Sequence, residues 1–123
     1  MTRREFREAI IKYLYSDIVG GELEIKESEE EIRPILMDIV LKSREIDEII
    51  SSCLTSWTID RLNLVDLAII RLATYEMKYL DIPKKIIINE ALEITKKYSN
   101  LDDDSAKKFN NRLLENIKNK LEE

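Results

Sequence analysis

The middle of the chain contains the pattern that most constrains the fold, an apolar stripe with helical spacing that a carboxylate interrupts. The stripe runs from Val65 through Ile69, Leu72, Glu76 and Tyr79 in steps of three or four residues. That spacing places all five side chains on one face of an α-helix. A carboxylate in an apolar layer is costly unless it is paired or hydrogen-bonded. We therefore expect a helix here, with a basic partner for Glu76.

A second carboxylate holds the same kind of position in the next helical segment. Glu90 lies between Ile87 and Ile94 in the apolar stripe of that segment. Arg61 and Arg71 are the expected partners of the two carboxylates. A structural network of ion pairs between helices is the favoured interpretation, and a functional site is the alternative.

Helical signals extend over nearly the whole sequence. The 123 residues include only two Gly and two Pro, and no alternating strand pattern bounded by turn residues is present. Thr2 with Glu5 and Ser28 with Glu31 form capping boxes, and Asn63 is a good N-cap. The sequence predicts an all-α fold, a compact bundle of about six or seven helices in one domain. The main helices are expected over residues 2–18, 28–54, 64–80, 83–98 and 105–121.

The charge is unevenly distributed along the chain. The net charge is −5, yet residues 1–15 carry +2 while residues 16–51 carry −7. This acidity argues against indiscriminate nucleic-acid binding, although a local basic patch could serve a specific partner. The N-terminus has no apolar signal core, and no run of about 18 apolar residues follows, so we expect a cytoplasmic protein without a membrane-spanning segment.

The composition speaks against catalysis. The chain has no His, a single Cys at Cys53, and no glycine-rich loop that could hold a phosphate. These absences remove the usual general base, a Cys/His zinc site and the common cofactor motifs. The acidic run 102–104 lacks the spacing of a calcium loop and is interpreted as a helix-capping loop. We predict no catalytic, metal or cofactor-binding residues, and a protein that is not an enzyme.

A binding function remains possible for this chain, and the first helix is the best candidate for the binding surface. Arg3, Arg4 and Arg7 cluster in its first two turns, followed by Lys12 and Tyr15. Basic side chains near a positive helix N-terminus are mildly unfavourable, and an anionic partner would offset that. An aromatic beside them could stack on a base or pack on a protein. The alternative is that these residues simply form the solvated face of an amphipathic helix.

Five ordered segments of this sequence resemble those of the NusB family of bacterial transcription antitermination factors. They cover nearly the whole chain and are least similar between residues 17 and 57. In order, the segments are Arg4-x-x-Arg7-Glu8 with Leu14-Tyr15, Arg61-Leu-x-x-Val65-Asp66 with Arg71-Leu-Ala73-x-Tyr75-Glu76, Ile82-Pro83, Ile88-Asn89-Glu90-Ala91, and Lys108-Phe109-x-Asn111.

The resemblance implies a fold and a function. It implies two helical subdomains within the single domain 1–123, an N-terminal one over about 1–57 and a C-terminal one over about 58–123. It implies a factor that pairs with the ribosomal protein NusE, binds boxA RNA in nascent ribosomal transcripts and acts within the RNA polymerase antitermination complex. The RNA-binding residues would be Arg3, Arg4, Arg7, Lys12, Lys107 and Lys108. The partner-binding residues would be Tyr15 and Asp66, with Asp66 at the exposed start of the central helix.

The sequence departs from the family pattern at several positions. Lys12 stands where Gln is common, Asn110 replaces an apolar residue and Arg112 replaces a Gly, so an altered surface on the last helix is expected. Residues 16–35 form a short segment, consistent with a reduced second helix. Two alternative functions stay open. One is an RNA-binding module of a ribosomal RNA cytosine methyltransferase without its catalytic domain, and the other is a homodimeric protein–protein adaptor.

Overall fold

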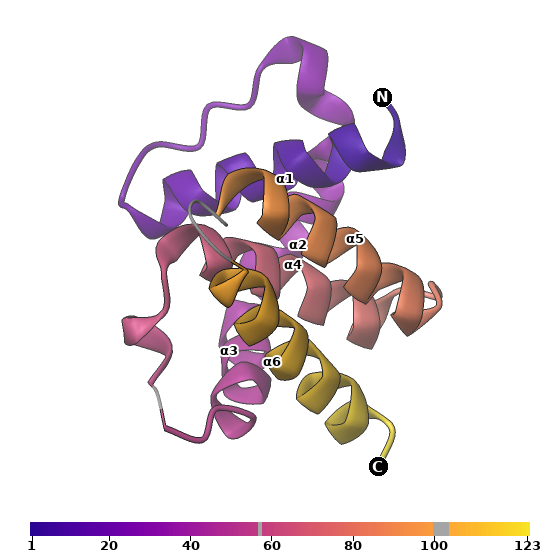
Figure 1. Ribbon diagram of the computed structural model, residues 1–123. Helices are drawn as coiled ribbons and strands as arrows, with labels where there is room; N and C mark the ends of the chain where they lie inside the picture. The colour runs from indigo at the N-terminus through magenta and orange to yellow at the C-terminus, as the bar shows by residue number, and fades with distance from the viewer. Residues whose placement is uncertain (57, 100–103) are drawn as a thin grey trace.

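The protein is described by a computed structural model that covers residues 1–56, 58–99 and 104–123. The described residues form six α-helices and two short 3-10 helices, and they contain no β-strand (Figure 1). The all-α prediction is confirmed. In chain order the elements are α1 (Arg3–Ile18), η1 (Glu27–Ile32), α2 (Arg33–Leu41), α3 (Ser43–Ser52), η2 (Ile59–Arg61), α4 (Leu64–Tyr79), α5 (Lys84–Tyr98) and α6 (Ser105–Leu121).

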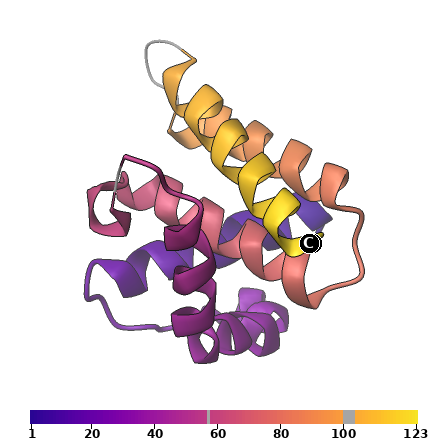
Figure 2. The ribbon, with the colours of Figure 1, turned by 90° about the horizontal axis from the view of Figure 1, so that it is seen from below.

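Helix α4 is the centre of the fold. It packs against α1, α3, α5 and α6, and the two views in Figures 1 and 2 show these helices arranged around it. Eleven of its 16 residues are buried, which is typical of a helix covered on all sides rather than along one stripe. One apolar cluster joins side chains from all six α-helices. Residues far apart in sequence therefore meet along α4.

Two of the caps that the sequence predicts, at Thr2 and Asn63, are present, but the capping box predicted at Ser28 and Glu31 is wrong, because η1 begins at Glu27 and has no side-chain cap. The backbone N–H of Glu5 donates to Thr2 Oγ1 at 3.0 Å, and the N–H of Thr2 donates to Glu5 Oε1 at 2.9 Å. Hydrogen bonds from the backbone N–H of Thr2, and from its side chain, lower the pKa of the Glu5 carboxyl. Asn63 Oδ1 accepts from the N–H groups of Val65 and Asp66 at 2.9 and 3.3 Å. The starts of α1 and α4 are thus fixed by local hydrogen bonds.

The single helix expected over residues 28–54 is wrong. The segment forms η1, α2 and α3 in succession, with Lys42 between the last two. Pro34 lies in the first turn of α2. Backbone N–H groups there have no acceptor within the helix, so the N–H that proline lacks costs no hydrogen bond. The bend at Lys42 lets α2 pack on η1 and α1 while α3 packs on α4 and α6. Because apolar spacing continues on both sides of a one-residue bend, periodicity alone does not reveal it.

The predicted subdivision near residue 57 falls between α3 and η2, and Trp57 lies outside the described residues. The predicted capping loop at 102–104 is also mostly outside them, and Asp104 is the residue that precedes α6. In the described part of the chain, no helix combines the length and the apolar character that a membrane crossing requires.

Candidate nucleic-acid interface

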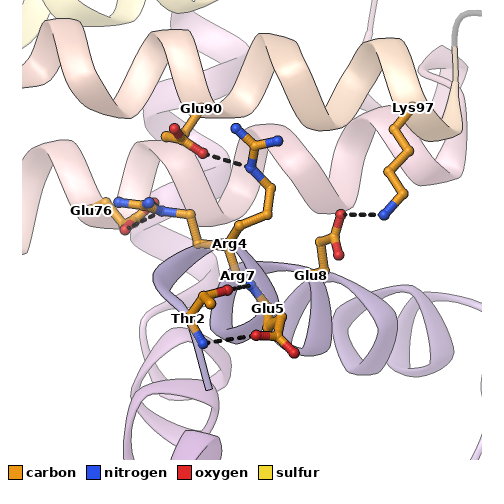
Figure 3. A network of polar contacts seen from close by, with 8 residues as sticks. All are labelled: Thr2, Arg4, Glu5, Arg7, Glu8, Glu76, Glu90 and Lys97. Atoms are coloured by element: carbon orange, nitrogen blue, oxygen red, sulfur yellow. Dashed lines mark hydrogen bonds and ion pairs between the residues drawn. The ribbon is translucent and has the colours of Figure 1, made fainter.

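The buried Glu76 on α4 is paired, and its partner is Arg7 on α1. Arg7 Nε donates to both carboxylate oxygens at 3.1 and 3.0 Å, and each residue is only 7% exposed (Figure 3). Burial raises the pKa of the Glu76 carboxyl, and the charge and hydrogen bonds of Arg7 partly offset that rise. The expected apolar position of Glu76 is confirmed. The ion pair ties the first helix to the central one.

The partners predicted for the two carboxylates are wrong. Glu90 accepts from Arg4 Nε at 2.8 Å, which lowers its pKa, and Glu76 pairs with Arg7. Arg71 instead forms a two-point ion pair with Asp47, at 2.8 and 2.7 Å. Since Glu76 and Arg7 are 69 residues apart in sequence, only the packing of α1 on α4 brings them together.

Two further ion pairs hold the outer face of α1. Lys97 Nζ on α5 donates to Glu8 at 3.0 Å (Figure 3), and Lys12 Nζ donates to both oxygens of Glu29 at 2.8 and 3.0 Å. The Tyr13 hydroxyl also donates to Glu29 at 2.6 Å. The hydrogen bonds from Lys12 and Tyr13 lower the pKa of Glu29. The basic residues of α1 therefore serve largely to attach this helix to its neighbours.

The predicted RNA-binding residues thus occupy unequal environments. Arg7 is buried, Arg4 and Lys12 are exposed but ion-paired, and Arg3 is exposed. Within the described residues Arg3 has no ion pair. Whether each of them contacts RNA stays a prediction, but the structure separates one unpaired cation from three that already have a carboxylate partner.

The start of α6 carries the other predicted RNA-binding residues. Lys108 is exposed and Lys107 is half-buried, and Arg112 is exposed one turn further along. None of the three is ion-paired to a described residue. Asn110, expected to alter this surface, is instead fully buried, so that expectation is wrong. Its Nδ2 donates to Asp66 Oδ1 and to Thr95 Oγ1, both at 3.1 Å.

The expected exposure of Asp66 is also wrong. Its side chain is 8% exposed and lies under the end of α5. Asp66 Oδ1 accepts from Ser99 Oγ at 2.5 Å and from Asn110 Nδ2 at 3.1 Å. A carboxylate at the start of a helix is favoured by the helix dipole as well. Asp66 therefore joins α4, α5 and α6, and its direct contact with a partner stays a prediction.

Tyr15, the other predicted partner-binding residue, lies in a groove. The groove has a volume of about 520 Å³ and runs along the outer face of α1. Tyr15, Val65 and Tyr98 supply apolar surface. Glu5, Glu8 and Glu29 supply an acidic rim, in which Glu29 is paired with Lys12, which also lines the groove, and Glu8 is paired with Lys97. Tyr15 is 40% exposed, and its contact with a partner stays a prediction. Such a groove suits a partner with apolar and basic side chains.

Sequence reasoning missed several residues that build this site. The sequence assigned no structural role to Glu8 and Glu29, which hold α1 in place, and it assigned a surface role to Asn110, which holds α6. The segments that resemble the NusB family include Glu8, which was the one available signal for its position. Glu29 lies in the first turn of the helix expected over residues 28–54, before the first apolar position of that helix, so no local pattern could assign its partner.

Comparisons with known proteins agree on one family. The model of the NusB family matches residues 4–119 of the chain. A transcription antitermination protein NusB from Bacillus cereus (strain B4264) is 37% identical over 133 aligned residues, which cover 98% of this chain and 100% of that protein. A Bacillus anthracis (strain A0248) protein of the same name shows the same identity and coverage.

Solved structures agree as well. The structure of T. maritima NusB is 32% identical, covers 97% of this chain and 92% of that chain, and superposes with a TM-score of 0.79. A structure described as antitermination factors NusB and NusE in complex with dsRNA is 26% identical, covers 98% of this chain and 99% of that chain, and gives a TM-score of 0.77.

Proposed function

Because this chain belongs to the NusB family, we propose that it is a transcription antitermination factor that pairs with the ribosomal protein NusE and binds boxA RNA in nascent transcripts. The observation that carries the proposal is the continuous similarity to NusB proteins over 98% of the chain. The similar solved structure that contains both NusE and RNA supports the two partners. We also propose that the protein acts on transcripts of ribosomal RNA operons, within the RNA polymerase antitermination complex.

The RNA-facing residues that we propose are those of the two basic segments, Arg3, Arg4, Arg7, Lys12, Lys107 and Lys108. Arg3, Lys107 and Lys108 have no described ion-pair partner, so they can neutralise phosphates without breaking a bond. Arg4 and Lys12 use only part of their donors in ion pairs. Arg7 is buried, and a ligand can reach it through a cavity that it lines.

The NusE-facing surface that we propose is the groove that contains Tyr15. Its acidic rim and apolar bed support a basic partner protein. Asp66 supports this surface indirectly. It accepts a hydrogen bond from Ser99, and the neighbouring residue Tyr98 lines the groove. The protein acts by binding rather than catalysis, in the cytoplasm, where nascent bacterial transcripts are.

The decisive experiment measures the affinity of the chain for a boxA-type RNA with and without NusE, at several salt concentrations. We expect NusE to raise the affinity and the logarithm of the binding constant to fall linearly with the logarithm of salt concentration. An affinity that NusE leaves unchanged contradicts the proposal. RNA binding would also exclude a pure protein adaptor, and light scattering of the free chain tests a homodimer.

A further inference from the structure

A second cavity lies beside the N-terminal end of α1, where its first turn meets the end of α4 and the start of α5. Its volume is about 500 Å³. Apolar side chains form most of its walls, contributed by Phe6, Leu80, Ile82, Pro83 and Ile86. Ile86 is 46% exposed at its rim, so a large apolar side chain faces solvent there. An apolar hollow that stays open at the surface is a candidate binding site.

The polar part of this cavity is the buried pair of Arg7 and Glu76, which both line it. Arg7 uses its Nε to bond both oxygens of Glu76. A guanidinium carries five N–H donors, so the Nη groups remain for another acceptor, and the carboxylate oxygens have further lone pairs. The ion pair fixes both side chains. It therefore places the donors of Arg7 next to the acceptors of Glu76, among the apolar residues that line the cavity.

Resting on the proposed RNA binding, we propose that this cavity takes up a single unstacked base of the bound RNA, and that guanine is the base it fits best. Apolar walls can contact the faces of a base, and fixed polar groups can read its edge. The Watson–Crick edge of guanine presents the O6 acceptor, which an arginine can bind, beside the N1–H and N2 donors, which a carboxylate can accept from. The pair of Arg7 and Glu76 supplies both partners.

The charges around the cavity suit a nucleotide. Arg3 and a second carboxylate, that of Asp81, line it, and Lys84 and Lys85 form the first turn of α5 directly after Pro83. These three cations have no ion-pair partner among the described residues. Pro83, the residue before α5, offers no side-chain cap to the first N–H groups of that helix. Phosphates on either side of an inserted base would therefore meet positive charge.

The test combines an exposed wall variant with an abasic scan of a boxA-type RNA. Ile86→Ser changes the cavity rim, and Leu41→Ser is the matched control, because Leu41 is 80% exposed on α2 and does not line the cavity. Each RNA carries one abasic nucleotide at a different position. Thermal unfolding of both variants verifies that they are folded.

We expect one abasic position to weaken binding to the unmodified protein by about tenfold, the typical cost of losing one stacked base. Ile86→Ser should weaken binding of intact RNA several-fold and remove most of the effect of that one abasic position, while Leu41→Ser changes neither. At that position, replacing guanine with inosine, which lacks the N2 amine, should cost less than replacing it with adenine.

The possible failures are distinguishable. If RNA binds tightly and every abasic position has the same effect in the unmodified protein and in Ile86→Ser, the base-binding inference is overturned while the proposed function stands. If Ile86→Ser weakens NusE binding and leaves RNA binding unchanged, the cavity belongs to a protein partner and the inference is again overturned. RNA that fails to bind even with NusE overturns both.

Discussion

The two basic segments of this protein, the start of α1 and the start of α6, contain similar residues that are used differently. In α1, Arg4, Arg7 and Lys12 each bond a carboxylate on another element. In α6, Lys107 and Lys108 bond no carboxylate of the described residues. A basic residue can therefore serve the fold or stay available to a ligand, and sequence does not distinguish the two.

The difference matters because a phosphate must compete with a carboxylate for a paired cation. Breaking a buried pair leaves an uncompensated charge and is strongly destabilising, whereas an exposed pair contributes little. We therefore expect changes at the buried Arg7 of α1 to affect stability first and RNA binding second, and changes at Lys107 and Lys108 of α6 to affect RNA binding alone. The following measurements test that division, from the largest expected effect to the smallest.

Arg7→Ala should have the largest effect. It leaves the buried Glu76 without its partner, and we expect a loss of about 3–5 kcal/mol in the free energy of unfolding. Urea unfolding gives that value. In the control, the double variant Arg7→Met with Glu76→Gln removes both charges and should recover part of the lost stability. A fully stable Arg7→Ala protein that loses only RNA affinity would contradict the division between the two segments.

Asp66→Ala should have the next largest effect, because Ser99 and Asn110 both lose the carboxylate that they bond. An unsatisfied buried donor typically costs about 1–3 kcal/mol. Urea unfolding measures the loss, and Asp66→Asn, which keeps one acceptor oxygen, should lose less. If Asp66→Ala weakens NusE binding while stability is unchanged, a direct contact with the partner explains Asp66 better than its structural role.

Replacing Lys107 and Lys108 with Ala should leave stability within about 0.5 kcal/mol of the unmodified protein, as expected for surface positions. RNA affinity should fall. The slope of log affinity against log salt is negative, and its magnitude should become smaller by about 0.7 for each single-strand phosphate that the variant no longer neutralises. Binding titrations at several salt concentrations measure both. Lys120→Ala, at the far end of the same helix, is the control. If Lys120→Ala lowers RNA affinity as much as the changes at Lys107 and Lys108, then α6 contributes to RNA binding only through its total charge.

The pH dependence of stability should also reflect the ion pairs of α1. The pKa values of Glu29 and Glu90 lie below the ordinary value of 4.5, so the stabilisation from these groups is present above that pH. It is lost as the pH falls through their lowered pKa values. Glu29→Gln lacks one of these groups, and its unfolding free energy should decline less between pH 6 and low pH. A decline as steep as that of the unmodified protein would contradict this.

Much of the fold could be predicted because it depends on local spacing. The caps at Thr2 and Asn63 were predicted from short-range patterns, and the structure contains both. Glu76 was expected in an apolar layer because helical periodicity places it there. The bend at Lys42 could not be predicted, since the apolar positions resume at Ile46 in the same helical phase as Ile39, with only Ser43 interrupting them.

The candidate site was only partly predictable, and the reason is distance along the chain. The sequence identified both basic segments and the buried carboxylates, because residue type and helical phase are local properties. Only the tertiary structure decided that Arg7 pairs with Glu76, that Asp66 is buried under Ser99, and that a cavity opens beside the first turn of α1. Each of these depends on how separate helices pack around α4. Pairing through space is set by that packing, which the local pattern of a sequence does not specify.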